Sequence, residues 1–128
     1  LLTLNALRAA DEVLIPLQSE YFALEGLARL MKTVERVRAG IHPGLRVGGI
    51  VLTMYDGRTN LSRQVGEDLR AHLPDLTYKV AIPRSVRLAE APSHGKPVIT
   101  YDISSSGAQA YLALTSEFCA RAGRKRGA

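Results

Sequence analysis

The sequence contains a single cysteine, and it has neither a long apolar run nor a cluster of metal-binding side chains. Cys119 has no partner for an intramolecular disulfide, which fits a reducing compartment. No stretch reaches the roughly 18 apolar residues that a membrane span needs, and the N-terminus lacks the cationic leader of a secreted protein. We therefore expect a soluble, cytoplasmic protein with no membrane contact.

The phosphate-binding pattern G-x-x-x-x-G-K-[ST] is also absent. The nearest candidate fails because Pro97 follows Gly95-Lys96 and because Glu90 stands where the first glycine would be. Phosphoryl transfer depends on positioning the phosphates and their metal ion. We therefore expect no catalytic residue in this chain, and no nucleotide hydrolysis by this chain alone.

The histidines do not indicate a metal site either. His42, His72 and His94 are scattered, and no cysteine or carboxylate follows them at the spacing of a metal site. We therefore predict that this chain has no metal-binding residue.

Charge and length indicate one modest domain. The net charge is +5, but Arg121, Arg124, Lys125 and Arg126 supply four of these charges, which leaves +1 for residues 1–120. A chain of 128 residues can bury about two-thirds of its unfolded surface in one core. We predict a single domain over residues 1–122, followed by a basic, disordered tail over residues 123–128.

Short apolar runs alternate along the chain with segments whose apolar residues recur at helical spacing. The expected strands are 12–17, 47–54 and 78–82, and the expected helices are 1–10, 21–38, 59–73, 85–91 and 106–122. Thr59, Ser85 and Ser106 are the expected N-caps of three of them. This alternation with short connections is typical of a parallel sheet. We therefore predict an α/β fold with three layers, α/β/α.

The ends of all three expected strands carry polar or charged loops. These loops are residues 18–20, 53–58 and 83–96, and the last of them is basic and bounded by prolines. Ligands of open parallel sheets bind beyond the carboxyl ends of the strands. The strand ends are therefore where we expect the function to lie.

The longest of these loops has a distinctive sequence. A strand ending in Ile-Pro-Arg (82–84) precedes Val-Arg-Leu (86–88), Glu-Ala-Pro-Ser (90–93) and His-Gly-Lys-Pro (94–97). This series closely resembles the chromosome- and plasmid-partitioning ATPases of the ParA/Soj type. Further matching segments are 1–7, 13–18, 23–27, 52–56, 58–61 and 107–111. The resemblance implies the C-terminal part of a P-loop NTPase fold, without the family's variant P-loop or its magnesium-linked aspartate.

The resemblance also implies a function for the intact protein. An intact relative binds ATP and Mg²⁺, forms a homodimer, binds DNA non-specifically, and is released when a ParB-type centromere-binding protein stimulates hydrolysis. Such a protein is cytoplasmic and associated with the nucleoid. Because the P-loop is missing, we expect no tight binding of ATP or Mg²⁺ by this chain, and the resemblance leaves open whether the chain belongs to an active ATPase.

Two sets of residues follow from the resemblance. In relatives, the strand end matching Thr53 and the loop matching Pro83, Arg84 and Ser85 lie against adenine, partly through backbone groups. Ser85 replaces the asparagine that is usual there, so recognition through the backbone is the expectation that remains.

The second set would contact DNA phosphates without reading the base sequence. It comprises Arg58, Arg87 and, as a weaker candidate, Lys96. Residues 102–106 read Asp-Ile-Ser-Ser-Ser where relatives often read Asp-Pro-x-Ser-Arg. One expected cation is therefore missing, and the basic surface is thinner than in relatives.

Two other functions stay open at this point. The chain can be a non-enzymatic remnant or binding module, which contacts DNA or pairs with a full-length relative. It can also belong to a related ATPase that positions other cargo, such as the division septum. The sequence does not separate a chromosomal from a plasmid system.

Overall fold

The computed structural model describes residues 1–127 of the chain. Its sheet consists of two parallel strands, β1 (Glu12–Gln18) and β2 (Arg46–Thr53). The ladder between them has one irregularity, between Val13 and Leu14. Both strands lie where the apolar runs predict them.

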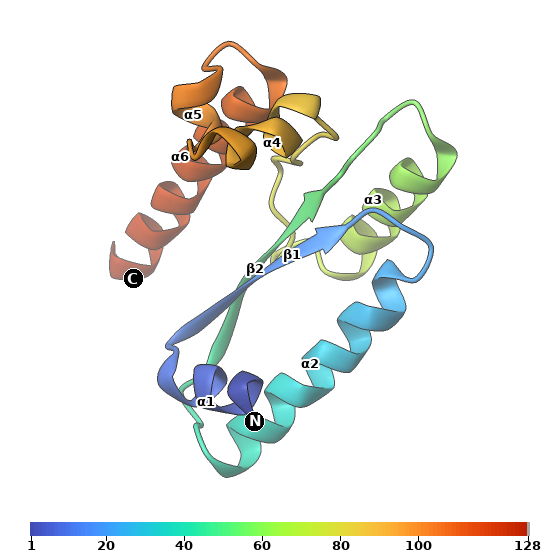
Figure 1. Cartoon of the computed structure of the whole chain (residues 1–128). Coiled ribbons are helices and arrows are strands. Elements are labelled where there is room, and N and C mark those ends of the chain that lie inside the picture. The colour runs from blue at the N-terminus through green and yellow to red at the C-terminus, as the bar shows by residue number, and fades with distance from the viewer. Residues whose placement is uncertain (128) are drawn as a thin grey trace.

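Helices surround this sheet (Figure 1). They are α1 (Leu2–Ala9), α2 (Ala23–Gly40), α3 (Asn60–His72), α4 (Val86–Glu90), α5 (Val98–Tyr101) and α6 (Ser106–Gly127), with a 3₁₀ turn at Ala91–His94. Helices α2 and α3 cover one face of the sheet and α6 lies against the other, so the chain has the predicted three-layer α/β/α fold (Figure 1).

The side chains of β2 alternate between the two layers of helices, as the pleat of a strand requires. Ile50 and Leu52 are buried with apolar residues of α2 and α3. Val51 is buried on the opposite face, where Ala110 and Leu114 of α6 pack. Because it is covered on both faces, β2 is the centre of the core.

The prediction of a regular third strand over residues 78–82 is wrong. This segment runs alongside β2 but pairs with it only through isolated parallel bridges, Ile50 with Thr77 and Tyr55 with Pro83. The N–H of Tyr78 donates to Ile50 and the N–H of Ile82 donates to Leu52, so four residues of this segment span two residues of β2 and the ladder is interrupted by a bulge. Within the bulge, the N–H groups of Lys79 and Val80 donate to the carboxylate of Glu117 in α6.

Of the three predicted N-caps, the structure confirms one and differs at two. Thr59 caps α3 as expected, because its hydroxyl accepts the N–H of Ser62 at 3.2 Å. Ser85 stands at the N-cap of α4 but makes no capping hydrogen bond with its side chain. The first turn of α6 is capped by Ser105, one residue before the predicted cap, since its hydroxyl accepts the N–H of Ala108.

Residues 123–127 continue α6, where we expected a disordered tail. Arginine and lysine are good helix formers, and the helix is anchored just before this stretch by Arg121, which bonds to residues 76 and 77. Ala128 lies outside the described residues. The single-domain boundary at residue 122 stays a prediction.

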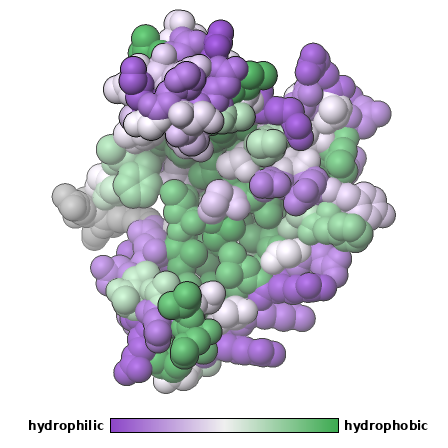
Figure 2. Space-filling view, viewed as in Figure 1, coloured by the Kyte–Doolittle hydropathy of each residue, from purple (hydrophilic) through white to green (hydrophobic). Residues whose placement is uncertain are grey.

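One side of β1 is open. Leu14 is 42% exposed and Pro16 is exposed, whereas Ile15 and Leu17 on the other face are buried. Figure 2 shows the resulting apolar area between the helices. The run 13–17 is therefore covered on one face only in the described part of the chain.

The helices of residues 1–127 include none that combines the length and the apolar character needed to cross a membrane.

Candidate functional site

The carboxyl ends of the strands meet at one rim of the sheet, as the predicted topology requires. The carbonyl of Thr53 accepts hydrogen bonds from the N–H and the hydroxyl of Ser19, at 3.1 and 3.2 Å. On its other side, the N–H of Tyr55 donates to Ile82 at 3.0 Å, and the N–H of Arg84 donates to Tyr55 at 3.1 Å. The loops after β1, β2 and residue 82 are therefore joined by backbone hydrogen bonds.

Met54 has a left-handed backbone at this rim, with φ of 53°. An unbranched non-glycine residue rarely adopts this conformation, and such strain concentrates at functional sites. Its side chain is exposed. Sequence reasoning missed this residue, because nothing in Thr-Met-Tyr signals a positive φ.

The four residues predicted to lie against adenine are brought together here. Thr53 ends β2, and Pro83, Arg84 and Ser85 form the loop that is bonded to the end of the same strand. Arg84 is exposed, while the other three are half-buried. The hydroxyl of Ser85 makes no capping hydrogen bond to α4. Their contact with a nucleotide stays a prediction.

Arg58 projects from this rim and is 90% exposed. Its guanidinium makes a two-pronged contact with Asp56, Nε to Oδ1 and Nη2 to Oδ2, both at 3.0 Å. The hydrogen bond from Arg58 lowers the pKa of the Asp56 carboxyl, and the charge of Arg84 lowers it further. Two predicted site cations therefore lie near one carboxylate at the strand ends.

Arg87 lies in a different setting. Its guanidinium contacts Glu90 at 3.1 Å and Asp102 at 3.2 Å, and the hydroxyl of Tyr101 donates to Glu90 at 2.7 Å. The hydrogen bond to Glu90 raises the pKa of the Arg87 guanidinium. Two carboxylates thus balance this cation, and binding to a phosphate would have to compete with them. Its DNA contact stays a prediction.

Lys96 lines an apolar groove between α6 and the loop region. The groove is a cavity of about 350 Å³ whose lining includes Leu88, Val98 and Tyr111. An apolar surface suits a phosphate backbone poorly. The structure therefore places the weakest of the three predicted DNA contacts in the least suitable surroundings.

Within residues 1–127, no group of three or more histidine, cysteine, aspartate or glutamate side chains is arranged to hold a metal ion.

Known proteins resemble this chain over almost all of its length. A sequence model described as an AAA domain matches residues 1–47. Chromosome partitioning protein ParA of Caulobacter vibrioides is 57% identical over 120 residues, which are 94% of this chain and 45% of that protein. The chain belongs to the ParA/Soj family. Sporulation initiation inhibitor protein Soj of Bacillus subtilis is 53% identical over 94% of the chain and 47% of its own length.

This chain spans about half the length of these ParA and Soj relatives. Among solved structures, cobyrinic acid a,c-diamide synthase from Mycobacterium smegmatis, with bound ATP analog and magnesium, aligns with a TM-score of 0.63 and 34% identity. The alignment covers 86% of this chain and 38% of that one. The likeness confirms the predicted α/β, P-loop ATPase type of fold.

Proposed function

We propose that this chain supplies the base-binding side of an ATP site, and part of a DNA-binding face, to a ParA/Soj-type ATPase that partitions chromosomes or plasmids. The observation that carries the proposal is the pair of backbone hydrogen bonds that hold the loop 83–85 against the end of β2, at Tyr55. They bring together the residues that the family resemblance assigns to adenine, at the rim where ligands of open parallel sheets bind.

The residues at this rim suit a base better than they suit phosphates. Thr53 and Ser85 offer hydroxyl groups, and the loop between them offers peptide groups, which are the small neutral donors and acceptors that a base requires. The sequence has no phosphate-binding loop. When bound in the intact protein, ATP and Mg²⁺ would supply the phosphoryl chemistry, and this chain would orient the base. We expect no tight nucleotide binding by this chain alone.

On this proposal, the intact protein is a cytoplasmic ATPase that dimerises around ATP and associates with the nucleoid by binding DNA non-specifically. A ParB-type centromere-binding protein would release it by stimulating hydrolysis. Arg58 is the best placed of the predicted DNA-binding cations, since it is 90% exposed and its only acidic contact in the described structure is Asp56. Arg87 would contribute less, because two carboxylates balance it.

Adenosine tests the base-binding side. Titrated in the millimolar range into the isotope-labelled chain, adenosine should shift the amide resonances of Tyr55, Arg84 and Ser85, and guanosine should shift them much less. Resonances of residues 23–40, on α2, serve as the internal reference. Equal shifts with both nucleosides, or shifts confined to other parts of the chain, would overturn the base-binding proposal.

Salt dependence tests the DNA-binding face. Replacing Arg58 with alanine should lower the slope of log affinity against log salt by about 0.9 for each duplex phosphate that the protein no longer neutralises, equally for unrelated sequences. Arg29→Ala is the matched control, because Arg29 is also exposed and paired with a carboxylate, that of Glu25, but lies on α2. Identical slopes for the two variants would refute a phosphate contact by Arg58.

A non-enzymatic module is the second candidate. Such a module would keep the DNA contacts or pair with a full-length relative. The coding sequence upstream of Leu1 separates the two functions. A lysine-bearing, glycine-rich loop in the same reading frame would support the ATPase, and a start codon at Leu1 would support the module.

A further inference from the structure

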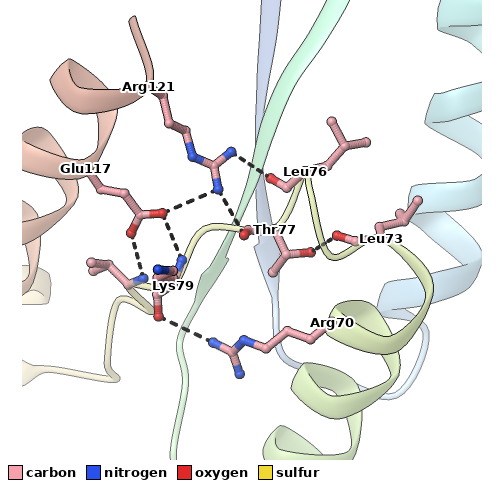
Figure 3. A network of polar contacts seen from close by, with 8 residues as sticks. Arg70, Leu73, Leu76, Thr77, Lys79, Glu117 and Arg121 are labelled. Carbon is pink, nitrogen blue, oxygen red and sulfur yellow. Dashed lines mark hydrogen bonds and ion pairs between the residues drawn. The ribbon is translucent and has the colours of Figure 1, made fainter. Parts of the chain in front are cut away.

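Two charged side chains of α6 hold the segment that leads into the loop 83–85 (Figure 3). The carboxylate of Glu117 accepts the N–H of Lys79 at 2.9 Å through Oε2, and the N–H of Val80 at 3.0 Å through Oε1. Both peptide groups lie in the bulge between Tyr78 and Ile82, whose N–H groups donate to Ile50 and Leu52 of β2. Glu117 therefore supplies the acceptors for the N–H groups inside the bulge.

Arg121, one turn further along α6, holds the preceding residues. Its guanidinium donates to the carbonyls of Leu76 at 3.2 Å and Thr77 at 2.9 Å, and contacts Glu117 at 3.3 Å. It also lies over the ring of Tyr78, with its central carbon 3.8 Å from the ring centroid. We call Glu117 and Arg121, with the peptide groups of residues 76–80, the α6 latch.

The latch is partly buried and its charges are balanced. The side chains of Arg121 and Glu117 are only 19% and 18% exposed. Partial burial of charges is costly unless they are paired and hydrogen-bonded. Glu117 and Arg121 are paired with each other, and both are hydrogen-bonded to backbone groups. From the other side, Arg70 of α3 reaches the carbonyl of Lys79 at 3.4 Å. The segment is thus irregular but firmly held.

The position of the latch determines where the loop 83–85 begins. Only Ala81 separates Val80, the last residue held by Glu117, from Ile82, whose N–H donates to Leu52 of β2 at 2.8 Å. The same Ile82 accepts the N–H of Tyr55 through its carbonyl. A shift of residues 79 and 80 would therefore be transmitted to the hydrogen bonds at the rim.

We propose that Glu117 and Arg121 are positioning residues for the loop 83–85, so that α6 and this loop move as one unit. The identity of the ligand rests on the proposed function, but the mechanical link does not. Because coupling between two sites is reciprocal, a ligand that orders the loop should also tighten the latch. The basic end of α6 is then connected to the strand-end rim through the body of the protein.

Amide hydrogen exchange of the 128-residue chain tests the link without any nucleotide. In Glu117→Gln, the side chain keeps its size but presents an NH₂ group to one of the two N–H donors. The amide of whichever of Lys79 and Val80 faces this NH₂ group should exchange about tenfold faster, as expected for removal of a hydrogen bond worth about 1.4 kcal/mol. The amides of Tyr55 and Arg84 should also exchange several-fold faster.

The amide of Ser19 is the reference, because it bonds to β2 on the side away from the latch. It should keep its exchange rate in Glu117→Gln, and all five amides should keep theirs in the control Glu67→Gln, an exposed glutamate of α3. Faster exchange confined to residues 79 and 80 would overturn the proposal, since the latch would then act only locally. Faster exchange at Ser19 as well would also overturn it, in favour of general destabilisation.

Arg121→Lys keeps the charge but cannot bond two carbonyls in the same way, and it provides the second variant if Glu117→Gln fails to fold. It should give the same pattern with smaller changes, and unchanged exchange at Tyr55 and Arg84 would overturn the proposal. Adding adenosine to the unsubstituted chain should slow exchange at residues 79 and 80. If adenosine does not bind, the base-binding proposal fails while the result for the variants still stands.

Discussion

Residues 12–73 and residues 76–102 are built in different ways. The first region consists of two paired strands and two helices with apolar stripes, all held by backbone ladders and a common core. The second region has no regular strand within the described chain, and its α-helices, α4 and α5, are five and four residues long. Its key contacts come from side chains distant in sequence, such as Glu117 to Lys79.

The difference shows two ways of fixing a backbone beside the same strand. On the β1 side, peptide groups bond to peptide groups, so many sequences with the same apolar pattern would serve. On the other side, individual charged side chains complete the pairing, and their loss is not compensated. We therefore expect the two regions to respond differently to substitution.

The largest effect should come from the shared core. Leu52 is 1% exposed and packs with residues of α2 and α3, so Leu52→Ala should cost about 2–5 kcal/mol of the free energy of unfolding. Urea denaturation would measure it, with Leu61→Ala, at an exposed position of α3, expected to change stability by about 0.5 kcal/mol or less. Similar losses of unfolding free energy in both variants would contradict the assignment of Leu52, and not Leu61, to the core.

The next effect should be confined to the second region. Glu117→Ala leaves the N–H groups of Lys79 and Val80 without their acceptor, and Arg121 without its carboxylate, which should cost about 2 kcal/mol. Chemical shifts should change mainly over residues 76–84. Ser116→Ala, at the adjacent position of α6, is the control. Shift changes of equal size in β1 would contradict the contrast between the regions.

A smaller effect should follow at the start of α3, which lies in the first region. Thr59→Ala removes the hydroxyl that accepts the N–H of Ser62, and the loss of such a cap costs about 1 kcal/mol. Thr59→Ser retains the oxygen and should restore most of the stability. Equal denaturation midpoints for the alanine and serine variants would show that the cap does not stabilise the helix.

The smallest expected effect is a change in the environment of Tyr101 at low pH. The hydrogen bond from Tyr101, and then that from Arg87, lower the pKa of the Glu90 carboxyl below its ordinary value of 4.5. A lowered pKa in the folded state gives stability that is present above the unfolded value and lost as the pH falls through the folded value. The ring resonances of Tyr101 should therefore move on acidification below about pH 4.5, and Glu90→Gln should abolish this transition. A transition that persists in Glu90→Gln would assign it to another carboxyl.

Periodicity in the sequence predicted the first region well, because its elements depend on local patterns. The prediction of a regular strand at 78–82 was wrong because this segment bulges away from β2, and the acceptor of the bulged N–H groups, Glu117, lies on a helix that no local pattern connects to it. At the site, the carboxyl ends of parallel strands meet at one rim, and this rule correctly predicted that Arg84 lies beside the loop of Asp56. It could not foresee that Asp102 would balance Arg87, since that contact depends on how α5 turns back.

Pro16 also affects the edge of β1 that faces away from β2, which has no strand partner in the described part of the chain. The N–H of Ser19 points toward β2, and because donors alternate along a strand, the nitrogen of Pro16 faces the opposite, outer edge. That edge therefore lacks a donor in its middle. A strand from another copy of the chain that attached there would meet a gap in its ladder, which discourages growth into fibres. In the described part of the chain, Pro16 thus makes this edge a poor template for the strand of another copy.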